Sequence, residues 1–170
     1  MAEPRTILVV MGVSGSGKTT IATALAQHLG WPFKDGDELH PAANIAKMRS
    51  GHALDDQDRW PWLARIADWI DAWQAAGSCG VITCSALKRS YREFLTKGRP
   101  AVRFVYLHGD VSLIATRLAA RNGHFMPSDL LASQFAALEE PGPEEHTIRV
   151  EIDQPVSEIL ATIASALGQS

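Results

Sequence analysis

Residues 7–19 of the chain read Ile7-Leu8-Val9-Val10-Met11-Gly12-Val13-Ser14-Gly15-Ser16-Gly17-Lys18-Thr19. The first five are apolar and mostly branched, which predicts a short strand buried on both faces. The last eight match the phosphate-loop pattern G-x-x-x-x-G-K-[ST] in full. Apolar residues at helical spacing follow, and Gly30 stands where a helix C-terminal glycine is common. A strand, a glycine-rich loop and a helix in this order are the context in which the pattern binds nucleotides.

The chemistry of nucleotide binding explains this spacing. Glycines let the loop curl, so that successive backbone N–H groups of residues 12–19 point inward and bind phosphate. The helix that begins near Lys18 directs the positive end of its dipole at the same phosphates. Lys18 is expected to reach the β- and γ-phosphates, and the Thr19 hydroxyl to bind Mg²⁺. The sequence therefore predicts a site for a nucleoside triphosphate.

The rest of the chain alternates between apolar strand-like and helical patterns. Further strands are expected at residues 31–35, 81–84, 102–107 and 148–152. Helices are expected at residues 42–48, from Pro61 to Trp73, at residues 90–97, after an Asp110 cap, after a Ser128 cap and at residues 156–167. This alternation predicts a five-stranded parallel sheet with helices on both faces, a three-layer α/β fold. Neither repeat nor linker divides the 170 residues, so we expect a single domain spanning residues 1–170.

Composition excludes several classes of protein. Sixteen basic and nineteen acidic residues leave a formal charge of -3, which argues against a nucleic-acid partner. No apolar run reaches the ~18–20 residues of a membrane span, and no signal-peptide pattern precedes Ile7. We therefore expect a cytoplasmic protein without a membrane partner. The tryptophan-rich segment from Trp60 to Trp73 is interpreted as core packing.

Common NTPase signatures beyond the phosphate loop do not occur in this chain. The motifs D-x-x-G and N-K-x-D of GTPases are absent. ATPase motors usually carry an acidic residue after an apolar strand, but the strand at residues 81–84 runs into Ser85-Ala86-Leu87-Lys88. An acidic residue that assists the metal is therefore expected elsewhere.

Asp35-Gly36-Asp37, at the end of the second expected strand, supplies that acidic residue. Carboxylates one residue apart on an extended chain point to the same side, and Gly36 permits close approach of a ligand. One carboxylate can hold Mg²⁺ through water, while the other accepts the proton of an attacking hydroxyl. A polar turn is the alternative, but the phosphate loop favours the catalytic interpretation.

Longer strings resemble the thermoresistant-type gluconokinases, within the P-loop small-molecule kinases. They include Asp35-Gly36-Asp37 with Leu39-His40-Pro41, Cys84-Ser85-Ala86-Leu87-Lys88 with Tyr91-Arg92, Gly123-His124-Phe125, Ser133-Gln134-Phe135 and Asp153-Gln154-Pro155. The resemblance covers nearly the whole chain. It implies a P-loop kinase fold, ATP and Mg²⁺ as cofactors, and phosphorylation of D-gluconate at its 6-hydroxyl. It also implies a homodimer.

The resemblance further implies roles for individual residues. Asp37 would be the base or orient the hydroxyl, and Asp35 would support the metal. A segment at about residues 121–128 would close as a lid. Arg121 would neutralise transition-state charge together with Lys18, while Arg117 would pack near the adenine. Gln154 and Pro155 would flank the base.

A linear sugar acid carries a carboxylate and several hydroxyls, so its site needs a cation and several polar groups. Besides Asp37, the candidates lie in loops expected to border the crevice: His40, Arg49, Arg59, Ser85, Lys88 and Arg92. Arg49 and Lys88 are the stronger candidates for substrate binding, because each follows an element expected to line the crevice.

Two other functions remain open from the residues alone. One is a kinase of another small metabolite, such as shikimate or a nucleoside. The other is a nucleotide-dependent regulatory module without phosphoryl transfer. Acceptor-dependent release of ADP separates these alternatives.

Overall fold

The computed structural model describes residues 6–52, 54–119 and 128–168. Its strands are β1 (Ile7–Met11), β2 (Phe33–Lys34), β3 (Gly80–Thr83), β4 (Val102–His108) and β5 (Ile148–Glu151). They form one sheet in the order β2-β3-β1-β4-β5, and every pairing is parallel. The predicted five-stranded parallel sheet is confirmed, although β2 is shorter than residues 31–35.

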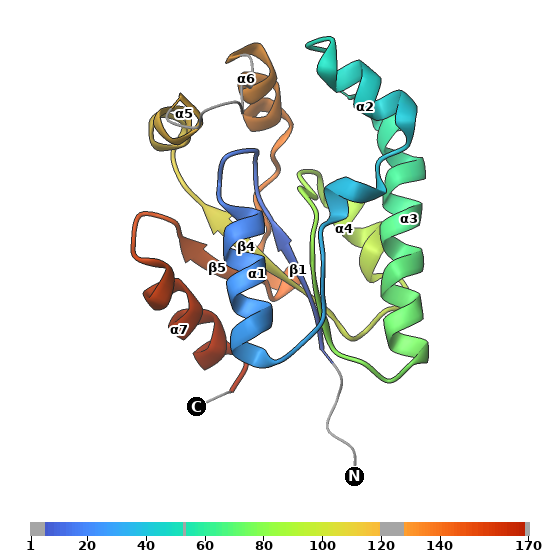
Figure 1. Cartoon of the computed structure of the whole chain (residues 1–170), viewed down its shortest axis with the longest axis vertical. Helices are drawn as coiled ribbons and strands as arrows, with labels where there is room; N and C mark the ends of the chain where they lie inside the picture. The colour runs from blue at the N-terminus through green and yellow to red at the C-terminus, as the bar shows by residue number, and fades with distance from the viewer. Residues whose placement is uncertain (1–5, 53, 120–127, 169–170) are drawn as a thin grey trace.

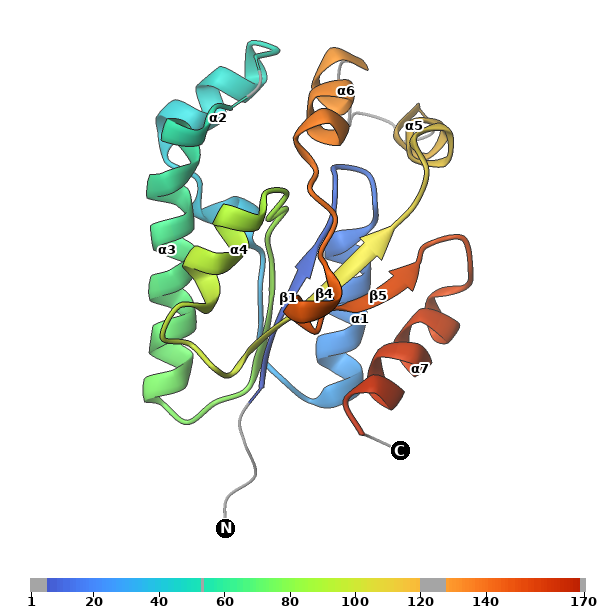
Figure 2. The same ribbon diagram turned by 180° about the vertical axis from the view of Figure 1, so that it is seen from behind.

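Helices cover both faces of this sheet (Figures 1 and 2). One face carries α1 (Lys18–Leu29) and α7 (Val156–Ala166), and the other carries α3 (Asp56–Ala75) and α4 (Arg89–Thr96). Three more helices lie beyond the carboxyl ends of the strands: α2 (Ala42–Arg49), α5 (Val111–Ala119) and α6 (Ser128–Ala137). Ligands of open α/β sheets bind at this end.

The central strand β1 explains why both faces are covered. All five of its residues are buried. Leu8 and Val10 belong to the apolar cluster beneath α1 and α7, whereas Ile7, Val9 and Met11 belong to the cluster beneath α3 and α4. Because side chains alternate along a strand, an entirely apolar strand requires a layer of helices on each side.

Helix α3 begins earlier than expected. A capping box starts it, because the Asp58 N–H donates to Asp55 Oδ1 at 2.8 Å and the Asp55 N–H donates to Asp58 Oδ2 at 2.9 Å. Pro61 therefore lies inside α3, and the prediction that it opens the helix was wrong. The reciprocal cap offsets the one hydrogen bond that a proline removes near a helix start.

The tryptophans of α3 divide between core and surface. Trp62 is only 2% exposed, but Trp60 and Trp69 are 38% and 37% exposed. The expectation of core packing therefore holds for Trp62 and was wrong for these two. Among the described residues, no helix combines the length and the apolar character needed to cross a membrane.

Candidate active site

The phosphate loop lies between β1 and α1 at the carboxyl end of the sheet (Figure 1). Gly15 and Gly17 have φ angles of 83° and 94°, a left-handed conformation that favours glycine. Lys18 Nζ donates to Gly12 O at 2.9 Å and to Val13 O at 3.0 Å, so the ammonium lies across the loop. The Ser16 hydroxyl is buried and has no partner among the described residues. A buried donor of this kind fits a loop built to bind phosphate.

The two carboxylates of residues 35–37 follow β2 directly. Asp35 caps the 3₁₀ helix η1 (Gly36–Leu39), because its Oδ1 accepts the Asp37 N–H at 3.0 Å. The Trp62 indole N–H of α3 donates to Gly36 O at 2.8 Å. A Cβ on Gly36 would lie 1.8 Å from Thr83 O, so only glycine permits this close approach to β3. The neighbouring strand and helix thus fix the position of both carboxylates.

Asp37 is chemically distinct from an ordinary surface carboxylate. Its side chain keeps contact with solvent, yet the surrounding protein raises its pKa above the usual value of 3.8 by desolvation. The Lys18 ammonium lowers this pKa and the Asp35 carboxylate raises it further. Lys18 and Asp35 are thus close enough to Asp37 for their charges to act on its carboxylate. A raised pKa makes Asp37 a better proton acceptor than a free carboxylate.

His40 is held as a neutral ring. It is 8% exposed and stacks on Trp62 with ring centroids 4.1 Å apart. The Asn44 amide nitrogen donates to Asp58 O at 2.9 Å and lies 3.2 Å from His40 Nδ1. Since that carbonyl can only accept, it fixes the Asn44 amide, so His40 Nδ1 accepts and Nε2 carries the proton. Burial, with the positive charge of Arg59, lowers the His40 pKa to about 4.

The turn at residues 85–88 joins the acceptor side of the site to the phosphate loop. Ser85 O accepts the Gly12 N–H at 3.3 Å. Ala86 has a φ of 46°, a strained conformation for a residue with a Cβ. Lys88 Nζ lies 2.8 Å from Asp56 Oδ1, which also accepts from the Tyr91 hydroxyl. Lys88 is therefore already ion-paired.

Arg49 contrasts with Lys88. It lies at the exposed C-terminal end of α2, where no hydrogen bond or ion pair joins it to another described residue. Arg59 is intermediate, since its Nη1 donates to the Tyr91 hydroxyl at 3.3 Å and its guanidinium lies over the Tyr91 ring. Among the candidate cations that the structure describes, Arg49 is thus the one least engaged by other described residues.

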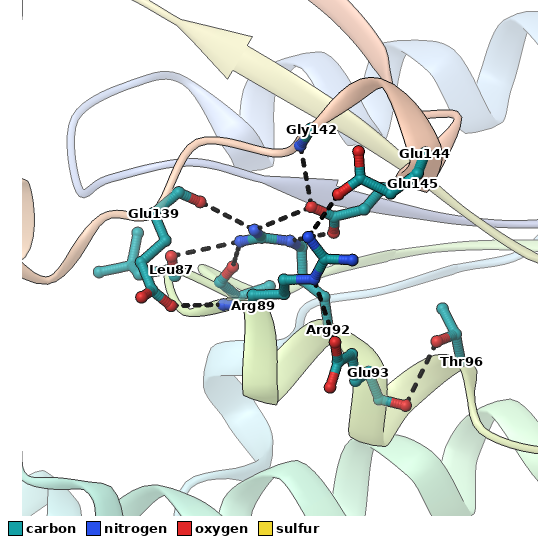
Figure 3. Close-up of polar contacts among 10 residues, drawn as sticks. Leu87, Arg89, Arg92, Glu93, Thr96, Glu139, Gly142, Glu144 and Glu145 are labelled. Carbon is teal, nitrogen blue, oxygen red and sulfur yellow. Dashed lines mark hydrogen bonds and ion pairs between the residues drawn. The ribbon is translucent and has the colours of Figure 1, made fainter.

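Arg92 does not fit the substrate role expected from the sequence. Its Nε donates to Glu145 Oε1 at 2.7 Å, and its Nη1 donates to the carbonyls of Ala86 and Leu87 at 2.8 and 3.2 Å. Its Nη2 donates to Glu139 O at 2.8 Å and to Glu145 Oε2 at 3.3 Å (Figure 3). All five donors are used and the side chain is 2% exposed, so Arg92 holds the turn and leaves none for substrate.

The residues expected to contact the nucleotide base come from α5 and from the segment between β5 and α7. Arg117 Nη2 of α5 donates to Ile152 O at 2.8 Å, directly before Asp153. Gln154 Nε2 donates to Glu151 O at 2.8 Å, and Pro155 precedes the first turn of α7. Arg121 and most of the expected lid at residues 121–128 lie outside the described residues.

Sequence reasoning missed two residues of the site. Thr83 contacts Asp35 from the end of β3, at an Oγ1–Oδ1 distance of 3.1 Å. Gln134 of α6 contacts Ser14 in the phosphate loop. Gln134 belongs to one of the strings that resemble gluconokinases, but that string alone indicated no partner.

Comparison with known proteins places this site in a family. Residues 14–165 match the sequence model of the shikimate kinase family. The chain is 55% identical to the gluconokinase of Gluconobacter oxydans over 148 residues, which cover 87% of this chain and 83% of that protein. The chain belongs to the gluconokinase family. Within that family it is also 47% identical to the thermoresistant gluconokinase of Escherichia coli over 157 residues, covering 92% and 90% of the two chains.

A solved gluconokinase structure from Sinorhizobium meliloti 1021 has the same architecture. It matches with a TM-score of 0.87 and 48% identity, covering 97% of this chain and 92% of that one. The predicted P-loop kinase fold is thereby confirmed, and the family to which the chain belongs is one of ATP-using kinases.

Proposed function

We propose that this protein is a gluconokinase that transfers the γ-phosphoryl group of ATP to the 6-hydroxyl of D-gluconate. The products are 6-phospho-D-gluconate and ADP. The observation that carries this proposal is the 55% identity to a gluconokinase over most of both chains. The pairing of a phosphate loop with two fixed carboxylates supports the reaction class independently.

The nucleotide site has the donors that ATP and Mg²⁺ need. We assign the phosphates to the buried Ser16 hydroxyl, to Lys18 and to the loop N–H groups that do not donate within the protein. The N–H groups of Gly12, Ser14 and Ser16 already donate to Ser85 O, Gln134 Oε1 and Val13 O. Thr19 and Asp35 offer oxygen donors, which Mg²⁺ prefers. Bound Mg²⁺ supplies charge neutralisation at the β- and γ-phosphates. Arg117, Gln154 and Pro155 would border the adenine, and Arg121 would add positive charge at the transferred group.

Asp37 is assigned to the acceptor hydroxyl. The bond between the gluconate 6-oxygen and the γ-phosphorus forms as the bond from that phosphorus to the bridging oxygen of ADP breaks. The proton of the hydroxyl passes to an Asp37 carboxylate oxygen. Lys18 stabilises negative charge on the transferred phosphoryl group, since phosphoryl transfer depends mainly on positioning and electrostatics.

The remaining candidates are assigned to the rest of gluconate. Arg49 is the best candidate for its carboxylate, because no ion pair with a described residue has to be broken first. Lys88 can also bind the gluconate carboxylate once its ion pair with Asp56 is broken. The His40 Nε2–H and the Ser85 hydroxyl are candidate donors to the sugar hydroxyls. Closure of residues 121–128 would exclude water and limit hydrolysis of ATP.

Two further expectations come from similarity to gluconokinases. We place the protein in the cytoplasm and expect a homodimer in solution. Light scattering on the purified protein tests the second, since a monomer mass would contradict it.

An acceptor panel tests the proposed function. ADP release is followed with D-gluconate, shikimate, nucleosides or water as acceptor, with Lys18→Ala as the inactive control. A large rise with gluconate alone supports the proposal. An equal or larger rise with shikimate or a nucleoside would indicate another metabolite kinase. A lack of response to every acceptor, with ATP still bound, would favour a regulatory module.

A further inference from the structure

Gln134 of α6 forms a two-point contact with the third residue of the phosphate loop. Its Oε1 accepts the Ser14 backbone N–H at 2.6 Å, and its Nε2 donates to Ser14 Oγ at 2.9 Å. Both atoms of the amide are used on a single residue 120 positions away in the chain. Two hydrogen bonds from one planar amide fix the orientation of Ser14 relative to α6 as well as its distance, whereas a single hydrogen bond leaves the orientation free.

The next residue of the loop is held from a second helix. A Cβ on Gly15 would lie 2.7 Å from Leu118 Cγ of α5, so the glycine lets α5 pack directly against the loop. Helices α5 and α6 also pack against each other. The outer rim of the phosphate loop is therefore positioned by the same pair of helices that stand beyond the sheet in Figure 1.

The other end of α6 leads to the acceptor side of the site. The Glu139 N–H donates to Leu87 O at 2.8 Å, and its carboxylate accepts the Arg89 N–H at 2.8 Å. Arg92 Nη2 donates to Glu139 O (Figure 3). Thus α6 with its C-terminal extension contacts the phosphate loop through Gln134 and the turn at residues 85–88 through Glu139.

We propose that Gln134 is a positioning residue that sets the phosphate loop, and with it the γ-phosphate, in register with the acceptor turn. The proposal rests on the proposed function, because it requires an acceptor at that turn. A misplacement of about 1 Å between reacting groups can cost up to about 100-fold in rate. Loss of the contact therefore lowers kcat and leaves the binding of ATP nearly unchanged.

The test uses Gln134→Met, which keeps the length of the side chain and removes both hydrogen bonds. We expect kcat with gluconate to fall about tenfold or more, with the KM for gluconate and the Kd of ATP changed less than about threefold. Gln27→Ala, an exposed glutamine on α1, is the matched control and should leave all three unchanged. Gln134→Ala should match Gln134→Met in kcat, since the hydrogen bonds and not the packing are responsible.

A double-mutant cycle identifies the partner. Ser14→Ala removes the hydrogen bond from Gln134 Nε2 to Ser14 Oγ. The fall in kcat of the double mutant should therefore be smaller than the combined effects of Ser14→Ala and Gln134→Met. Additive effects, or an unchanged kcat in Gln134→Met, would overturn the proposal. Tighter ATP binding in Gln134→Met would also overturn it, because Gln134 would then compete with phosphate for the Ser14 N–H. Wild-type protein inactive with gluconate would instead refute the proposed function.

Discussion

The Thr83 hydroxyl donates to Asp35 Oδ1 at 3.1 Å and accepts the Gly36 N–H at 2.9 Å. Thr83 ends β3 and Asp35 follows β2, so one hydroxyl links the ends of two neighbouring parallel strands. The bond orients the Asp35 carboxylate, which we assign to Mg²⁺. Groups that orient a metal-binding carboxylate commonly change metal affinity by about 10–100-fold when they are removed.

Thr83→Val therefore tests the metal role of Asp35. The substitution keeps the branched shape and removes the hydroxyl, so the Mg²⁺ concentration for half-maximal activity should rise about tenfold or more. A Mg²⁺ titration of ADP release measures it, and Thr83→Ser should restore the wild-type response. An unchanged titration curve in Thr83→Val would contradict the role of this contact.

Asp37→Asn tests the proton acceptor. Without a basic oxygen at this position, kcat should fall by roughly 10²–10⁴-fold. Binding of ATP, measured by calorimetry, should remain close to that of the wild-type protein. Near-normal turnover in Asp37→Asn would show that another group takes the proton.

The same variant should be more stable at neutral pH. The folded protein raises the pKa of Asp37 above its unfolded value of 3.8, so its stabilising contribution is complete below pH 3.8 and is lost as the pH rises through the folded pKa. At pH 7 the ionised carboxylate opposes folding, and an amide does not. The Tm of Asp37→Asn should exceed that of wild type at pH 7, and the difference should shrink toward pH 4. A lower Tm at pH 7 would contradict this sign.

His40 predicts a loss of stability in mild acid. Its folded pKa of about 4 lies below its usual value of 6.5, so the unfolded chain binds the proton more readily between these values. The contribution of His40 is complete above pH 6.5 and is lost as the pH falls toward 4. Urea unfolding at pH 7 and pH 5 should show a smaller pH effect in His40→Phe, which keeps the stack on Trp62. The exposed His28→Phe on α1 is the control for replacing a histidine by phenylalanine.

Arg92 and Arg89 form a matched pair on α4 (Figure 3). Arg92 is 2% exposed and bonded to Glu145, whereas Arg89 is 49% exposed in its ion pairs with Glu93 and Glu144. Arg92→Met leaves Glu145 and three carbonyls without their donor, so it should destabilise the fold by about 3–5 kcal/mol. Arg89→Met should change the free energy of unfolding little, because exposed pairs are screened by solvent. Equal effects in urea unfolding would contradict the structural role of Arg92.

The predicted site residues that the structure brings together are those whose placement depends on local sequence. The phosphate loop needs its glycines and Lys18 within eight residues, and the carboxylates of Asp35 and Asp37 share one turn. Apolar periodicity was likewise sufficient for the sheet, since β1 carries the pattern of a strand buried on both faces.

The errors at Arg92 and Gln134 concern contacts between distant segments, whereas the error at the start of α3 is local. The sequence alone does not distinguish an arginine of α4 that faces substrate from one that, like Arg92, pairs with a partly buried glutamate 53 residues away. The partner of Gln134 is 120 residues away, and no local pattern signals it. Proline is a common first residue of helices, so Pro61 suggested too late a start for α3. The reciprocal hydrogen bonds of Asp55 and Asp58 determine where the helix begins.

Identification of the reaction product tests the proposed gluconokinase activity. The protein is incubated with ATP, Mg²⁺ and D-gluconate, and the products are assigned by mass spectrometry and by phosphorus–proton correlation in NMR. We expect one phosphorylated gluconate per ADP, with the phosphate on the 6-oxygen, and none with Lys18→Ala. ADP accompanied only by inorganic phosphate, or phosphate on a different oxygen, would contradict it.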